Sequence, residues 1–486
     1  MALKISLAAR ALLALVLLVG FYLLAIAIAA GLLILAYAMI VYARQINVQL
    51  LLVCIISPLV IFWSILPRWD RFRAPGPELK PKEQPRLFAE VQAIADAVGQ
   101  RMPREVYLVP DVNAWVAQRG GVLGIGSRRV MGLGLPLMQA LSRSQLRAVL
   151  AHEFGHYHGG DTALGPLVYK TRATIIRTIQ GLGNSIVQAP FLWYGKMFLR
   201  LTHSVSRHQE YAADALAARI VGARPLVTGL QQIHSASVAI GPYFSNVVAP
   251  ALGAGYRPPF ANGFARFLRA NAISDMLSKM LEAEMASVQS NPYDTHPPLQ
   301  QRIAALKSIA AGEPAADDSP AITLLDDVPG LEARLLASMF GEDKTRDLKP
   351  VRWEDLGENV HRPNWERLLK QHASALAGLT FASLPELARD VPAFANRLAK
   401  AVNQQISAEQ APHLTNVIVG AALAQALLMR GWTLHAEPGD PFTLRRGEEV
   451  IDPFKIFPGL ASGELSADDW RRQCEWWGIA TVSLKP

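Results

Sequence analysis

The longest apolar stretch of the chain lies close to its N-terminus. No charged residue occurs between Arg10 and Arg44, and Leu, Ala, Val and Ile dominate this interval. It exceeds the roughly 20 residues with which a helix crosses a bilayer, so it predicts a transmembrane helix at about residues 11–41. A second apolar run predicts another span at about residues 48–66. Residues 1–74 are therefore expected to form a membrane anchor.

After the anchor, the apolar positions follow shorter repeats. Four prolines in residues 75–85 indicate a stiff tether. Apolar residues then recur at helical spacing from Arg86 to Gly99. Three short β-rich runs are expected to form a small antiparallel sheet: residues 106–109, 122–125 and 130–135. With the helical patterns that follow, they predict a mainly α, α+β domain over residues 86–308.

Asn113, Ala114 and Trp115 lie between two of these runs and continue the β pattern. An exposed strand at this position could pair with an extended peptide backbone by β-augmentation. It could equally be an ordinary edge of the sheet, and both interpretations stay open.

The segment from Gly181 to Leu201 is apolar but is interrupted by glycine, proline and lysine, and aromatic residues fill its second half. It is a poor transmembrane span. Two interpretations stay open: an interfacial segment lying near the membrane, or a pair of helices in a folded core.

The last third of the chain has a different pattern. Residues 309–346 are predicted to form a linker and a packing segment, because they begin with an Ala-, Asp- and Pro-rich stretch. In residues 347–486, helical patterns precede short β-rich runs, which predicts a small C-terminal α+β domain. Its histidines are scattered and it contains no motif with a recognisable chemistry, so its role is not predicted.

The net charge of +8 suggests an acidic partner. No stripe of Lys and Arg interleaved with aromatic residues is present, so we expect no nucleic-acid partner, and the basic residues cluster beside the apolar segments instead. This distribution predicts a lipid bilayer as the partner and places the main domain in the cytoplasm, as in a bacterial inner membrane protein. The basic residues that follow the second span are Arg68, Arg71, Arg73, Lys80 and Lys82.

A motif of two histidines and a carboxylate occupies one helical turn. His152 and His156 are four residues apart and therefore share a helix face, with Glu153 beside them. This HExxH spacing is that of zinc peptidases, in which the metal lowers the pKa of a bound water and the glutamate is the general base. Ser142 and Gln145 have capping-box spacing, which predicts the start of that helix.

A third metal ligand must come from elsewhere in the chain, because a catalytic zinc takes three protein ligands. Glu210 and Asp214 are one helical turn apart, so Glu210 can bind zinc while Asp214 accepts a hydrogen bond from a ligating histidine. His203 and His208 compete for the ligand role. Farther on, His296 precedes two prolines at a predicted helix start, where it could donate a hydrogen bond to an oxyanion.

Taken together, these motifs resemble the membrane-linked zinc endopeptidases that include the CAAX prenyl proteases and the HtpX-type proteases. The matching residues are His152 to His156, Gly160-Asp161, Glu210 to Asp214, and Thr295 to Leu299 with Arg302. The resemblance implies a zincin-like fold and one Zn²⁺ per chain, bound by His152, His156 and Glu210. It also implies that Glu153 is the base, that Asp214 supports a ligand, and that His296 and Arg302 stabilise the tetrahedral intermediate.

The resemblance further implies that Asn113, Ala114 and Trp115 bind the substrate backbone. The expected function is that of a membrane-anchored zinc endopeptidase that hydrolyses proteins or peptides, in the processing or quality control of membrane proteins. The family members differ in their membrane spans, so a prenylated substrate does not follow from the resemblance. The alternative is a non-catalytic membrane scaffold with a structural zinc and a partner-binding C-terminal domain.

Overall fold

The computed structural model describes residues 7–43, 45–66, 72–120, 126–157, 164–286, 297–310 and 318–485. The chain divides into two compact units, and each is described by itself. Unit 1 comprises Met1–Ser237 with Lys279–Met339, and unit 2 comprises Val238–Ser278 with Phe340–Pro486. Residues 238–278 thus group with the C-terminal residues, although they lie within the predicted domain 86–308. The predicted domain boundaries stay a prediction.

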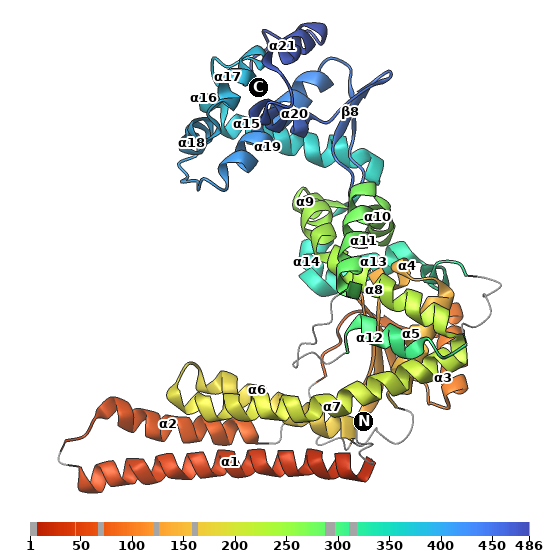
Figure 1. Cartoon of the computed structure of the whole chain (residues 1–486), viewed down its shortest axis with the longest axis vertical. Helices are drawn as coiled ribbons and strands as arrows, with labels where there is room; N and C mark the ends of the chain where they lie inside the picture. The colour runs from red at the N-terminus through yellow and green to blue at the C-terminus, as the bar shows by residue number, and fades with distance from the viewer. Residues whose placement is uncertain are drawn as a thin grey trace. The chain divides into compact units, whose positions relative to one another are not determined.

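Two apolar helices begin unit 1, as predicted. They are α1 (Leu7–Tyr42) and α2 (Val48–Ile65), which pack side by side (Figure 1). Both are long and apolar enough to cross a membrane. The 36 residues of α1 extend over about 54 Å at 1.5 Å per residue, so the helix is longer than the hydrocarbon core of about 30 Å.

A helical pair packs against these two helices. It consists of α6 (Leu164–Leu182) and α7 (Ala189–Val221), joined through the short helix η2 (Ile186–Gln188). Phe191 and Tyr194 of α7 are buried against Phe21 of α1, and the Tyr194 hydroxyl donates to the Leu17 carbonyl at 2.6 Å. The segment 181–201 is therefore part of a helical pair packed on α1 and α2.

The sheet of unit 1 has the order β1-β2-β4-β3, and its strands are β1 (Glu78–Leu79), β2 (Glu105–Val109), β3 (Ala114–Arg119) and β4 (Arg128–Gly134). The expected small sheet is present, but it is mixed rather than purely antiparallel, because β2 and β4 run parallel. The largely buried β4 folds back between β2 and β3, where it has neighbours on both sides. Residues 122–125, a predicted run, lie outside the described residues.

One glycine lets β4 pass close to the preceding turn. A Cβ on Gly134 would lie 1.9 Å from the Asp111 backbone oxygen. Instead, the Gly134 amide donates to the Asn113 carbonyl at 2.8 Å. This contact fixes the start of β3, which is an edge strand of the sheet.

The helix that carries the HExxH motif is α5 (Arg143–Gly155), and it begins with the predicted capping box. The Ser142 side chain accepts from the Gln145 amide, and the Gln145 side chain accepts from the Ser142 amide. Helix α3 (Pro85–Val98) holds α5 in place through the buried Glu90, which pairs with Arg143 at 2.9 Å and with Arg147 at 3.3 Å. The remaining helices of unit 1 are α4 (Leu135–Ala140), α12 (Leu299–Leu306) and most of α13 (Val328–Phe340).

Unit 2 is an α+β body, as expected for the C-terminal region. Its central helix is α19 (Ala411–Leu428), which lies in an apolar core that also includes Trp365, Phe381 and Trp470. The antiparallel sheet consists of β7 (Thr433–His435), β8 (Thr443–Arg446) and β9 (Glu449–Ile451).

Shorter elements complete unit 2. Two short strands pair in parallel: β5 (Tyr256–Arg257) and β6 (Lys349–Pro350). The other α-helices that the structure describes wholly within this unit are α9 (Ala249–Gly253), α10 (Phe260–Arg269), α14 (Glu342–Thr345), α15 (Arg362–Gln371), α16 (Ala373–Leu376), α17 (Leu384–Ala388), α18 (Val391–Ala401), α20 (Pro453–Ser462) and α21 (Ala467–Trp476). Helices α8 (Ala223–Tyr243) and α11 (Asn271–Ala286) each belong to both units.

Candidate metal centre

The two histidines of the motif lie on one face of α5. Because they are one helical turn apart, their rings meet edge to face with the centroids 4.7 Å apart. Their Nε2 atoms are 3.2 Å apart. His152 is buried and His156 is half-buried, so the pair is open to one side.

Helix α7 brings a carboxylate to this pair. Glu210 is buried, and its oxygens lie 3.6 Å from His152 Nε2 and 3.5 Å from His156 Nε2. The two helices approach closely because Gly155 has no side chain: a Cβ there would lie 3.2 Å from the Ala213 Cα. The close approach of α5 and α7 therefore brings the third donor to the histidines.

The three donors fit a tetrahedral metal ion. Ligands at about 2.0–2.1 Å from a tetrahedral centre are separated by roughly 3.3–3.4 Å. The two Nε2 atoms are 3.2 Å apart, Glu210 Oε2 lies 3.6 Å from His152 Nε2, and Glu210 Oε1 lies 3.5 Å from His156 Nε2, all close to that value. Two imidazoles and a carboxylate are the ligand set of a catalytic zinc, which keeps its fourth position for water or substrate. The structure thus brings together the three residues that the sequence predicted as metal ligands.

A second layer of contacts holds the ligands. The Asp214 carboxylate lies 2.9 Å from His152 Nδ1, on the far side of the ring from the metal-facing nitrogen. Arg302 of α12 donates two hydrogen bonds to the same carboxylate, at 2.6 and 2.8 Å. Burial by itself would raise the pKa of Asp214, but the hydrogen bonds from Arg302 and His152 outweigh it and hold this pKa well below its usual range. Asp214 is therefore an anion that orients His152.

Arg302 was expected beside an oxyanion, and in the structure it binds a carboxylate. Its guanidinium is buried, bound to Asp214, and 3.9 Å from Glu210. These contacts give Arg302 a position behind the ligands. His296, its expected partner, lies outside the described residues, as do Gly160 and Asp161 and the side chains of His203 and His208.

Glu153 follows the first ligand directly and is half-buried. Its charge contributes to the raised pKa values of Tyr157 and Arg302, in both cases with a smaller effect than burial, which raises the pKa of Tyr157 and opposes the rise in that of Arg302. A half-buried carboxylate beside the ligand pair is suited to exchange protons with a water at the open side of the site.

The three predicted substrate-binding residues lie at the start of the edge strand. Asn113 is exposed, and its carbonyl is occupied by the Gly134 amide. Ala114 is buried as the first residue of β3, and the Trp115 ring lies against Gly132 of β4. Helix α5 contacts β3, so the zinc-peptidase motif and this edge strand are neighbours.

Tyr157 was not predicted to be functional. It follows the second histidine, and its hydroxyl donates to the Val116 carbonyl of β3 at 2.8 Å. The Arg129 guanidinium carbon lies 4.4 Å from the centre of the Tyr157 ring. The backbone carbonyl of Tyr157 accepts a hydrogen bond from the Gln100 side chain. Burial raises the pKa of Tyr157 to about 12, so the hydroxyl keeps its proton. No motif indicates this bond, because it joins segments about 40 residues apart.

The fold and the site together define a metallopeptidase. The comparison with known families agrees, because residues 81–310 match peptidase family M48. The match includes α5, α7 and α12, which contribute the histidines, Glu210 and Arg302. The chain is accordingly a protease with a metallopeptidase domain.

The curated relatives include HtpX proteases. The chain is 26% identical over 281 residues to Protease HtpX of Serratia proteamaculans (strain 568), covering 50% of this chain and 81% of the relative. It is also 26% identical to Protease HtpX of Enterobacter sp. (strain 638) and of Yersinia enterocolitica, over 279 residues each and with the same coverage. No solved structure matches the chain. The predicted resemblance to the HtpX-type metallopeptidases is thus confirmed.

The Asp214→Asn substitution tests the support of His152. We expect Zn²⁺ to bind about 10- to 100-fold more weakly, because the amide keeps the shape of the carboxylate but loses the charge that orients the imidazole. Competition with a chromophoric chelator on the purified full chain measures this affinity. Asp96→Asn, an exposed substitution on α3, is the matched control. Equal zinc affinity in the Asp214 variant and the wild type would contradict the role of Asp214.

Proposed function

We propose that the protein is a membrane-anchored, zinc-dependent endopeptidase with Glu153 as its general base. The observation that carries the proposal is the triangle of His152 Nε2, His156 Nε2 and the Glu210 carboxylate, whose sides suit a tetrahedral zinc. Glu153 directly follows His152 in the sequence, as the glutamate does in the HExxH motif of zinc peptidases. The relatives named Protease HtpX support the same reaction.

The residues of the chain divide the work between binding, orientation and proton transfer. Zn²⁺, when bound by His152, His156 and Glu210, would lower the pKa of a coordinated water and polarise the scissile carbonyl. Glu153 accepts a proton from the attacking water and returns it to the leaving amine. Asp214, held by Arg302, fixes the ring of His152 and strengthens it as a ligand. His296 stays the predicted donor to the oxyanion.

The substrate is proposed to bind as an extended peptide along β3. An edge strand offers backbone N–H and C=O groups that can pair with a second chain. Among the described strands, β3 is the edge of its sheet next to α5. Tyr157 bonds β3 to the end of the zinc-binding helix, so it sets the position of the substrate strand relative to the metal.

The main test is the Glu153→Gln variant of the purified full chain. We expect casein cleavage to fall by about 10²- to 10⁴-fold, because general acid–base catalysis contributes this much. Zinc content is expected to stay at the wild-type level, because Glu153 is not among the proposed ligands. A chelator should abolish wild-type cleavage and added Zn²⁺ should restore it. Cleavage at the wild-type rate by Glu153→Gln would overturn the mechanism, and zinc-loaded wild type without turnover would favour the non-catalytic scaffold.

A second prediction concerns the substrate strand. In Tyr157→Phe, we expect the KM for an extended peptide to rise about threefold to tenfold, because one hydrogen bond of about 1 kcal/mol no longer positions β3. The kcat value and the zinc affinity should change little, because neither the ligands nor Glu153 is altered. Steady-state kinetics on a fluorogenic peptide separates these quantities. A fall in zinc affinity with an unchanged KM would assign Tyr157 to the metal site instead.

We further propose that the peptidase domain lies in the cytoplasm. Membrane proteins are its proposed substrates. The basic residues after the second predicted span support this orientation. Trypsin should therefore degrade the domain in inside-out membrane vesicles and leave it intact in right-side-out vesicles. Immunodetection of a C-terminal tag reports the digestion. Protection in inside-out vesicles together with digestion in right-side-out vesicles would reverse the topology.

A further inference from the structure

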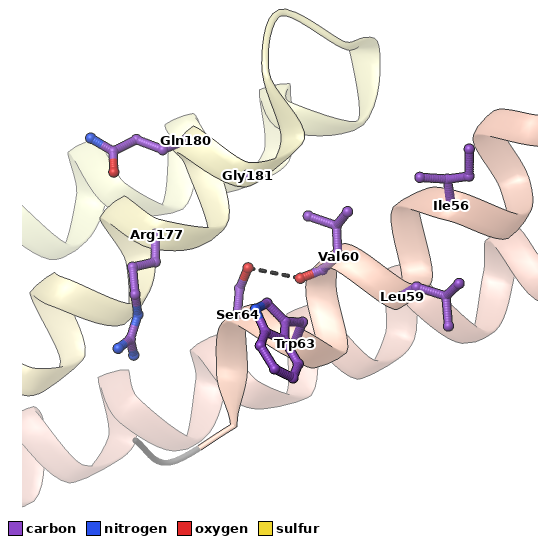
Figure 2. A pocket seen from close by; sticks show the side chains of 8 residues that line it. All are labelled: Ile56, Leu59, Val60, Trp63, Ser64, Arg177, Gln180 and Gly181. Carbon is purple, nitrogen blue, oxygen red and sulfur yellow. Dashed lines mark hydrogen bonds between the residues drawn. The ribbon is translucent and has the colours of Figure 1, made fainter. Parts of the chain in front are cut away.

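A groove lies between α2 and α6, within unit 1 and apart from the metal centre. Its volume is about 630 Å³, within the range of small-molecule sites. Figure 2 shows the residues that line it: Ile56, Leu59, Val60, Trp63, Ser64, Arg177, Gln180 and Gly181. The two helices approach closely at Gly181, which has no side chain. A Cβ there would lie 3.0 Å from a methyl group of Val60.

The groove is polar at one end and apolar at the other. Arg177 lies on the side of Ser64 and Trp63, near the C-terminal end of α2, whereas Ile56 and Leu59 lie farther along that helix (Figure 2). Ile56 and Ser64 are eight residues apart, which is about 12 Å along a helix. The groove therefore runs parallel to a helix that is apolar enough to span the membrane.

Among the eight lining residues, the charged side chain is that of Arg177. Arg177 is half-buried, and it donates to the Thr174 hydroxyl at 2.8 Å, which steadies its side chain. None of the eight lining residues is acidic. Trp63 is 68% exposed, as expected of an aromatic residue at the membrane interface. An anionic head group beside Arg177, with a hydrocarbon chain over Ile56 and Leu59, matches both ends of the groove.

We propose that this groove binds an anionic phospholipid. The Arg177 guanidinium binds the phosphate, because a planar fork of donors suits phosphate oxygens. One acyl chain lies along Ile56, Leu59 and Val60. The lipid would thereby cover the contact between helix α2 and helix α6. This inference depends on α2 spanning the membrane and is independent of the catalytic proposal.

The test uses Trp63 as the reporter, with the full chain reconstituted in phosphatidylcholine bilayers. Brominated acyl chains quench nearby tryptophans, and the difference between the wild type and Trp63→Phe isolates the signal of Trp63. We expect brominated phosphatidylglycerol to reach half-quenching at about fivefold lower mole fraction than brominated phosphatidylcholine, because one basic residue contributes about this preference for an anionic lipid. Inorganic phosphate should not displace the lipid, since it lacks the acyl chain.

Variants of α6 decide whether Arg177 is responsible. Arg177→Gln should abolish the fivefold preference, and Arg177→Lys should retain most of it because the charge remains. Arg172→Gln removes an exposed arginine from the same helix outside the groove, so it should leave the preference unchanged. Equal quenching by the two lipids in the wild type would overturn the proposal. It would also be overturned if Arg172→Gln lost as much of the lipid preference as Arg177→Gln. Absence of quenching by either lipid would also overturn it, and would indicate that protein occupies the groove.

Discussion

The metal centre depends on one buried carboxylate, that of Asp214. It lies on α7, is 1% exposed, and contacts His152 of α5 and Arg302 of α12. A buried ion pair is costly to form, and removing one partner leaves an uncompensated charge that destabilises a protein by several kcal/mol. The same contact therefore ties three helices together and holds an imidazole in place for the metal. A substitution of Asp214 is therefore expected to affect both the stability of this part of unit 1 and the geometry of the site.

Helix α7 also connects the metal centre to the membrane helices. Its first turns carry Phe191 and Tyr194, which pack on α1, and its later turns carry Glu210 and Asp214. The 16 residues from Tyr194 to Glu210 measure about 24 Å along the helix. One continuous helix therefore sets the distance from the apolar span to the ligand triangle.

The sequence could predict the features that depend on local spacing. The capping box at Ser142, the shared face of His152 and His156, and the turn between Glu210 and Asp214 each involve residues within one helical turn, and the structure reproduces the geometry of each. The pairing of distant segments could not be predicted. The position of β4 between β2 and β3 and the bond from Tyr157 to Val116 arise from tertiary packing, which leaves no periodic signal in the sequence.

Burial separates the membrane helices from the apolar core helix of unit 2. Helices α1, α2 and α19 are all long and apolar enough to span a bilayer. In α19, most side chains are buried by the surrounding helices, so a folded core already accounts for its composition. In α1 and α2, Leu23, Ile34 and Leu59 are each more than 60% exposed. A helix surface covered by exposed large apolar side chains is stable only in contact with lipid or with another protein. The exposed apolar surface therefore supports the membrane assignment of α1 and α2, which composition alone could not distinguish from α19.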